Sequence, residues 1–255
     1  MNAKKISLLL VAIALFFSSA ATARTLEEIK KAGVIRIAAD GATPPFNYFK
    51  GKELVGFEVD LGNEIAKRLG VKAEWVVKPF NTLLVAIAED RFDLIATSHA
   101  KTAKRAEVVD FINPHYCTGA AIISKEGGPK TAKDLKDKVV VTAVGTVYFD
   151  KLKTMPWIKE VRTVPNEMDG LQSLLGGRAD AWVTEKFVGL EAIAKHKDAK
   201  LGLGEVILPQ ENAMVVAKGN VTLEKAVNKV LKDIMADGTY SKDLKKYFEQ
   251  DIRCK

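Results

Sequence analysis

The chain has 255 residues, with 39 basic and 32 acidic side chains and a formal net charge of +7. Acids lie among the lysines, as in Glu224–Lys225, and no basic stripe is interleaved with aromatic residues. This pattern is typical of a solvated surface and argues against a nucleic-acid partner. The length suits one large domain or two smaller lobes.

The N-terminus has the order of a secretory signal peptide. Lys4 and Lys5 precede an apolar run from Ile6 to Phe17, and the small residues of Ala21–Ala23 follow. The run is shorter than the roughly 20 apolar residues that a membrane span needs. We therefore predict a signal peptide over residues 1–23 and a mature protein in the periplasm, with an uncleaved anchor as the alternative.

Apolar spacing predicts strands and helices that alternate along the chain. The first series comprises helix 26–32, strand 34–39, helix 57–69, strand 74–77, helix 82–89 and strand 92–96. The second series comprises strand 120–124, strand 139–143, helix 147–153, strand 160–164, helix 167–175, strand 181–183, helix 185–196, strand 213–217 and helices 223–237 and 240–248. The alternation predicts an α/β protein with mostly parallel sheets, and the break at 111–117 suggests two lobes.

The stretch from Asp93 to Tyr116 carries the clearest local signal. Thr102 has the chemistry of a helix N-cap, and Arg105 follows in the first turn, where a cation opposes the helix dipole. An arginine placed there suggests a carboxylate-binding fork rather than helix stabilisation. The alternative is an ordinary surface arginine, because the pattern is short.

The two cysteines, Cys117 and Cys254, both follow the predicted signal peptide. In an oxidising compartment an even pair favours one disulfide. We predict an intramolecular bridge; two free thiols, or capture of Cys254 by another chain, are the alternatives.

Motifs for common cofactors are missing from the sequence. It has no G-x-G-x-x-G, no Walker A loop and no G-x-S-x-G elbow. The histidines His99, His115 and His196 show no metal-ligand spacing. We predict neither a cofactor nor a metal site.

Six motifs in chain order resemble one family. They are Pro44–Phe46 after Asp40, the run Gly56–Leu61 with its following helix, the loop 93–105, Asp110–Phe111 with Pro114 and Tyr116, Gly176–Ala181, and Asp237–Tyr240 with Tyr247–Phe248. With them the chain resembles the periplasmic solute-binding proteins of polar amino-acid ABC importers, extracellular solute-binding protein family 3. The resemblance implies a two-lobed type II fold, in which each lobe has a mixed, mostly parallel sheet flanked by helices. It also implies two hinge crossings, with lobe 1 at 24–115 and 211–255 and lobe 2 at 116–210.

The resemblance implies that the protein binds a zwitterion by both of its charged ends. Arg105 and Thr102 would hold the α-carboxylate, and Thr146 would close over it from lobe 2. Such charge-assisted hydrogen bonds contribute about 1.5–3 kcal/mol each.

The same resemblance implies partners for the rest of the ligand. The Ser98 carbonyl and the Glu185 carboxylate would take the ammonium group, and Asp40 would reach the distal part. Phe46 and Phe80 would form apolar walls. For Glu185 the alternative is a helix-start acid favoured by the dipole, and for the two phenylalanines it is core packing.

Three positions depart from the family pattern. Thr43 stands where many members have a stacking tyrosine, and Ala100 where many have a hydroxyl that helps to hold the carboxylate. His99 stands where the residue is usually apolar or small, and either packs or replaces that contact. These differences leave the identity of the amino acid open.

The function that the resemblance implies is capture of an amino acid or a similar zwitterion for an inner-membrane ABC permease, by a monomer with no enzymatic activity. A periplasmic dehydratase on the same scaffold, with Glu185 or Asp40 as general acid, is the alternative. A sensory module acting through a partner is a third possibility.

Overall fold

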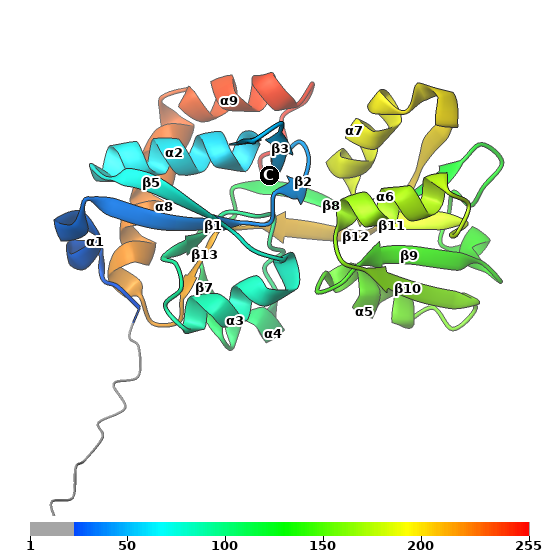
Figure 1. Cartoon of the computed structure of the whole chain (residues 1–255), viewed down its shortest axis with the longest axis horizontal. Coiled ribbons are helices and arrows are strands. Elements are labelled where there is room, and N and C mark those ends of the chain that lie inside the picture. Colours follow the sequence, from blue (N-terminus) through cyan, green and yellow to red (C-terminus); the bar gives the residue numbers. More distant parts are fainter. Residues whose placement is uncertain (1–22, 255) are drawn as a thin grey trace, which may run out of the picture.

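The computed structural model describes residues 23–254, so the predicted signal peptide lies, except for Ala23, outside the described residues. Two lobes lie side by side, each built around its own sheet (Figure 1). None of the helices between residues 23 and 254 combines the length and the apolar character needed to cross a membrane.

The first lobe is built on a five-stranded sheet in the order β5-β1-β6-β13-β7. β1 (Val34–Ala39) pairs in parallel with β5 (Lys72–Val77) and β6 (Leu94–Ile95). β13 (Val215–Ala217) runs antiparallel to both β6 and β7 (Val109–Phe111). All strands except β13 therefore point the same way, which confirms the predicted mixed sheet.

Helices and a small sheet complete the first lobe. The small sheet joins β2 (Ala42–Thr43), β3 (Asn47–Lys50) and β4 (Glu53–Val55). The helices are α1 (Leu26–Ala32), α2 (Phe57–Leu69), α3 (Leu83–Ala88), α4 (Ala103–Ala106), α8 (Val221–Ala236) and α9 (Thr239–Tyr247). In α2 the buried Phe57, Leu61 and Ile65 recur at helical spacing and face the core. Gly70, with a φ of 78°, ends that helix in the left-handed conformation that glycine adopts without strain.

The second lobe has a five-stranded sheet in the order β10-β9-β11-β8-β12. β9 (Val139–Ala143) is parallel to β10 (Glu160–Val164) and β11 (Ala181–Glu185). β8 (Tyr116–Lys125) is antiparallel to β11 and to β12 (Leu201–Asn212). Its helices are α5 (Val147–Lys153), α6 (Glu167–Leu175) and α7 (Lys186–Lys195).

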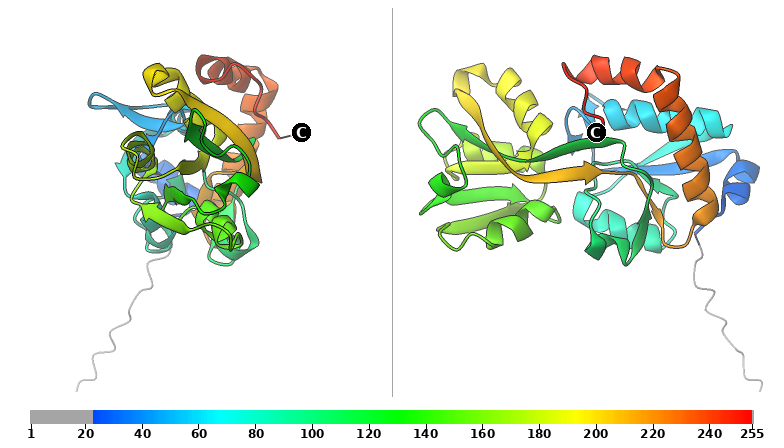
Figure 2. Two further views of the ribbon diagram at one scale, coloured as in Figure 1. Left: turned by 90° about the vertical axis from the view of Figure 1, so that its right-hand side faces the viewer. Right: turned by 180° about the vertical axis from the view of Figure 1, so that it is seen from behind.

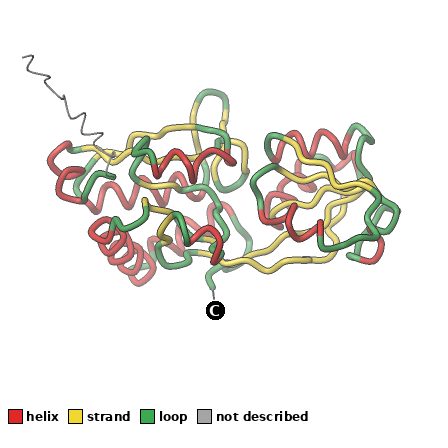
Figure 3. The backbone as a smooth tube through the Cα atoms, turned by 90° about the horizontal axis from the view of Figure 1, so that it is seen from below, coloured by secondary structure: helices red, strands yellow, loops and turns green. Residues whose placement is uncertain are grey.

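The long strands β8 and β12 connect the two lobes. They pair from Lys125 and Leu201 in lobe 2 down to Tyr116 and Asn212 at the junction. Figure 2 shows them running together between the lobes, and Figure 3 shows the lobes joined along one side by these strands. The two predicted hinge crossings are thus neighbouring strands, an arrangement that lets one lobe swing against the other.

β12 has no counterpart among the predicted strands. Its sequence carries Gly202, Gly204 and Pro209, and such residues weaken strand propensity. The strand forms because β8 pairs with it, with register shifts between Leu203 and Leu208. Tertiary pairing here overrides local preference.

The predicted Cys117–Cys254 disulfide is confirmed. It ties the C-terminal segment to the first residues of β8, where the Cys117 N–H also donates to the Ile252 carbonyl at 2.7 Å. Ile252, only 3% exposed, anchors the same segment in the core of lobe 1. The bridge therefore joins the end of the chain to the base of the hinge.

Removing this bridge is expected to lower the stability of the protein. The linked cysteines are 137 residues apart, and for so long a loop the chain-entropy model gives about 4–5 kcal/mol. A Cys117→Ser/Cys254→Ser variant should show this loss of unfolding free energy in urea titrations. Adding reductant should destabilise the native protein and leave the variant unchanged; equal stability of both proteins would contradict the expectation.

Candidate functional site

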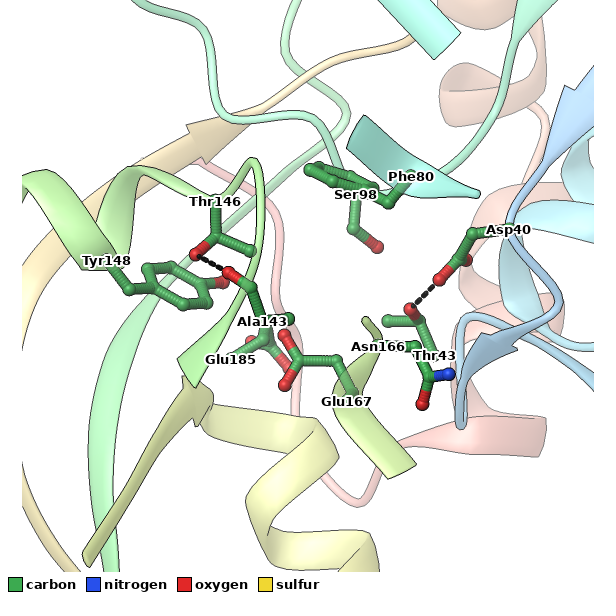
Figure 4. A pocket seen from close by; sticks show the side chains of 10 residues that line it. All are labelled: Asp40, Thr43, Phe80, Ser98, Ala143, Thr146, Tyr148, Asn166, Glu167 and Glu185. Atoms are coloured by element: carbon green, nitrogen blue, oxygen red, sulfur yellow. Dashed lines mark hydrogen bonds between the residues drawn. The ribbon is translucent and has the colours of Figure 1, made fainter. Parts of the chain in front are cut away.

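A cavity of about 30 Å³ lies between the two lobes (Figure 4). Several of its lining residues lie at the carboxyl ends of strands: Asp40 after β1, Ser98 after β6, Ala143 ending β9, Asn166 after β10 and Glu185 ending β11. Ligands in α/β folds bind at this edge of a sheet. Here the ligand-binding edges of two sheets face each other. The other lining residues are Thr43, Phe80, Thr146, Tyr148 and Glu167.

Lobe 1 contributes Asp40 to the cavity. Its two carboxylate oxygens accept hydrogen bonds from the Thr43 hydroxyl at 2.8 Å and the Thr97 hydroxyl at 2.9 Å. Burial raises the pKa of Asp40 to about 6. Thr43, which departs from the family pattern, thus supplies a hydroxyl that positions this carboxyl group.

Ser98 is held in position by the buried Glu58. The Ser98 backbone has a φ of 46°, in the left-handed region that costs a non-glycine residue free energy. The Glu58 carboxylate accepts hydrogen bonds from the Ser98 N–H at 2.6 Å, the Ser98 hydroxyl at 3.1 Å and the Asn47 amide at 3.1 Å. Glu58 of the Gly56–Leu61 motif therefore fixes the loop that follows β6.

Lobe 2 contributes Glu185, which has two roles. One oxygen caps α7 by accepting the N–H groups of Phe187 at 2.6 Å and Val188 at 2.9 Å. The other oxygen accepts the Thr118 hydroxyl, from β8. Glu185 is thus the helix-start acid of the alternative interpretation and also lines the cavity. Burial raises its pKa to about 7.

Glu167, the first residue of α6, lines the cavity beside Glu185. Its Oε2 accepts hydrogen bonds from the Thr184 hydroxyl at 2.8 Å and the Trp182 indole at 3.2 Å. Burial raises its pKa to about 8, and the charges of Asp40 and Glu185 act in the same direction. Glu167 is not among the predicted site residues, although its place at a helix start after a parallel strand is a usable signal.

Arg105 lies at the outer edge of the cleft. Its Nη1 donates to the Ala100 carbonyl of lobe 1 at 2.8 Å, and its Nη2 donates to the Gly145 carbonyl of lobe 2 at 2.9 Å. The predicted Thr102 cap is confirmed, since its hydroxyl accepts the Arg105 N–H at 3.2 Å. Arg105 and Thr102 line an adjoining groove that shares Thr146 with the cavity.

The two phenylalanines expected as walls lie in different places. Phe80 lines the cavity, with His99 stacked on its ring at 4.4 Å and the Arg105 guanidinium 5.9 Å from its centre. Phe46 is fully buried in the core of lobe 1, where it stacks on Tyr116 at 4.8 Å. Phe46 therefore packs in the core and does not line the cavity. His99 packs as well, and burial holds its pKa well below the usual value.

The lobes are in contact in this structure. Besides the Arg105–Gly145 hydrogen bond, Gly145 packs so tightly that an added Cβ would lie 2.8 Å from the Asn81 side chain. Its φ of 81° also favours glycine. The conformation is a closed one, and opening it would expose the cavity to water.

A family model described as bacterial extracellular solute-binding proteins, family 3, matches residues 35–250. The chain belongs to this family. It is 31% identical over 232 residues to the L-cystine-binding protein TcyJ of Escherichia coli K12, covering 89% of this chain and 87% of that protein. As its family indicates, it is a solute-binding protein rather than an enzyme.

Solved structures agree with the sequence relatives. An ancestral arginine-binding protein bound to glutamine superposes with a TM-score of 0.82 at 32% identity, covering 86% of this chain and 99% of that one. The ancestral amino-acid-binding protein AncCDT-1, a precursor of cyclohexadienyl dehydratase, gives a TM-score of 0.81 at 30% identity, with 88% and 99% covered. Both matches confirm the two-lobed architecture.

Replacing Glu58 by Gln should lower the stability of the protein and weaken ligand binding. The new amide would place a donor against groups that already donate, leaving buried partners unsatisfied at a cost of about 1–3 kcal/mol. We expect a matching loss in chemical denaturation, and weaker ligand binding because the Ser98 loop loses its support. The exposed Glu53→Gln is the control, and an unaltered Glu58→Gln variant would refute the role.

We expect lobe closure to depend on pH, because opening would expose the three cavity carboxyls Asp40, Glu167 and Glu185 to water. Their pKa values in the closed form, about 6, 7 and 8, lie above those of water-exposed acids. The closed form therefore binds more protons between about pH 4.5 and 8, so raising the pH across this window favours opening. Without ligand, small-angle scattering should give a larger radius of gyration at pH 8.5 than at pH 5.

The same scattering measurement on a Glu167→Gln variant tests whether the cavity carboxyls cause this change. It should show a smaller pH-dependent change in radius, because one of the titrating groups is gone. A radius that is constant or that falls with rising pH in the native protein would count against the expectation.

Proposed function

We propose that the protein captures an amino acid in the periplasm, closes its two lobes around it and delivers it to an inner-membrane ABC permease. In this proposal lobe 1 comprises residues 24–115 and 211–255, and lobe 2 comprises 116–210. The protein acts as a monomer and is secreted by a signal peptide over residues 1–23. Family membership and the amino-acid-binding relatives support this function.

The single observation that carries the proposal is the position of Arg105. Its guanidinium bridges the lobes, from the Ala100 carbonyl to the Gly145 carbonyl. A ligand carboxylate that takes up this fork accepts charge-assisted hydrogen bonds, which are stronger than those to a neutral carbonyl. Binding and closure are then coupled, because the same cation contacts both lobes.

In this proposal the predicted residues contact different parts of the ligand. The carboxylate end lies at Arg105, Thr102 and Thr146, at the junction of groove and cavity. The ammonium group lies deeper, near the Ser98 carbonyl and Glu185. Asp40 and Phe80 face the side chain, and Phe46 supports the site only through the core of lobe 1.

The dehydratase alternative receives less support. Glu185 has a raised pKa, as a general acid needs, but its oxygens hold α7 and Thr118. The family and the named relatives are binding proteins. The AncCDT-1 match is itself to an amino-acid-binding protein.

Arg105→Ala is the direct test of the site. Losing two charge-assisted hydrogen bonds should weaken amino-acid binding at least about 100-fold in calorimetry, while the thermal melt of the ligand-free protein shows that it still folds. Arg105→Lys keeps the charge but loses the fork and should bind at least about 10-fold more weakly than the native protein.

Arg91→Ala removes the same guanidinium from a side chain that is 71% exposed and lines neither the cavity nor the groove, so it is the matched control. It should bind within about twofold of the native protein. The ligand is first identified by a thermal-shift screen of the common amino acids and L-cystine; one present at 100 times its Kd adds about 2.7 kcal/mol of stability. An Arg105→Ala variant with native affinity would reject the site.

A further inference from the structure

The C-terminal segment, residues 248–254, runs from lobe 1 to the base of the hinge. Figure 2 shows it leaving the end of α9 and reaching the paired strands β8 and β12. Phe248 and Ile252 are buried in the core, and Cys254 is bonded to Cys117 of β8. The segment is therefore fixed at both of its ends, although it closes the described part of the chain.

The ring of Phe248 contacts both lobes. In lobe 1 its centre lies 5.3 Å from that of Phe46 and 5.4 Å from that of Phe57. In lobe 2 it lies 5.1 Å from the ring of Phe187, with the two ring planes at 74°. Edge-to-face pairs at such distances are favourable for aromatic rings. Phe248 therefore joins the C-terminal segment directly to the start of α7.

Phe187, the second residue of α7, holds the cavity carboxyl of Glu185 through its backbone. Its N–H donates to Glu185 Oε2 at 2.6 Å, and the Val188 N–H donates to the same oxygen at 2.9 Å. The Lys186 Nζ lies 5.1 Å from the centre of the Phe187 ring, which is itself buried. A shift of this ring would move the backbone donor beside it, so the position of the Glu185 carboxyl depends on how Phe187 packs.

The other oxygen of Glu185 depends on the same segment by a second route. Oε1 accepts the hydroxyl of Thr118, the residue that follows Cys117 in β8. Cys117 carries the disulfide to Cys254, and its N–H donates to the Ile252 carbonyl at 2.7 Å. Thr118 thus comes directly after the point where the C-terminal segment is tied to the hinge. Both oxygens of the carboxyl are therefore held by groups that adjoin this segment.

We propose that the C-terminal segment positions Glu185 for the ammonium group of the bound amino acid. Phe248 acts through Phe187, and the disulfide acts through Thr118. Neither Phe248 nor the two cysteines line the cavity, so they are positioning residues rather than ligand contacts. A charge-assisted hydrogen bond weakens when its acceptor is displaced from the donor, which links the placement of Glu185 to affinity. This inference rests on the proposed function.

Calorimetry with the tightest-binding of the common amino acids and L-cystine tests the route through Phe248. Phe248→Leu keeps an apolar side chain but loses the ring contact, and it should weaken binding about 3–10-fold. Glu185→Gln removes the charge and keeps an acceptor for the N–H groups of α7. In that background Phe248→Leu should change the affinity by less than about 1.5-fold, because residues that act through one group have non-additive effects. A merely structural effect would be the same in both backgrounds.

The matched control is Phe111→Leu. Phe111 ends β7 in lobe 1, is 8% exposed and does not line the cavity. The substitution removes the same atoms from the core of the same lobe, so it should lower the melting temperature while the affinity stays within about twofold of the native value. Thermal melts establish that each variant is folded. If Phe248→Leu does not fold, Phe187→Leu removes the same ring contact from the side of lobe 2 and takes its place.

The Cys117→Ser/Cys254→Ser variant tests the route through the disulfide. It should weaken binding at least about threefold, and only while Glu185 is present. Native affinity in this variant or in the Phe248 variant would overturn the inference and leave the proposed function standing, as would effects that simply add to that of Glu185→Gln. Absence of binding of any amino acid to the native protein would overturn both.

Discussion

Three carboxyl groups face one small cavity between the closed lobes, and the rest of the site follows from that constraint. Burial raises the pKa values of Asp40, Glu185 and Glu167 to about 6, 7 and 8. Without a positive partner, each ionised carboxyl in the closed cavity costs free energy. In the proposed site, the ammonium group of a bound amino acid offsets this cost, so we expect binding to favour the closed form.

The surrounding structure places the charged groups at defined positions in the cleft. The paired strands β8 and β12 bring the ligand-binding edges of two sheets together. Arg105 spans the cleft at its outer edge, so in the proposed site the negative end of a ligand meets a guanidinium that contacts both lobes. Glu58 holds the Ser98 loop from beneath. Positive and negative ends of the cleft are therefore arranged before the ligand arrives.

Local chemistry made much of this predictable. Thr102 and Arg105 formed a recognisable cap and fork, whereas the predicted roles of Asp40, Ser98 and Glu185 came from the family resemblance. Phe46 and Phe80 could not be separated from sequence, because both follow strand-like segments and only tertiary packing decides which ring meets the core. Glu167 was missed since the face of the first turn of α6 depends on how Trp182 and Gly170 pack. The strand β12 was missed because its pairing partner, rather than its own residues, makes it extended.

A crystal structure of the protein grown with the amino acid that the thermal-shift screen identifies tests the proposed site most directly. We predict closed lobes, with the ligand α-carboxylate on the Arg105 guanidinium and its ammonium group near the Ser98 carbonyl and Glu185. A ligand bound elsewhere, or bound in the cleft with its carboxylate away from Arg105, would contradict the proposal.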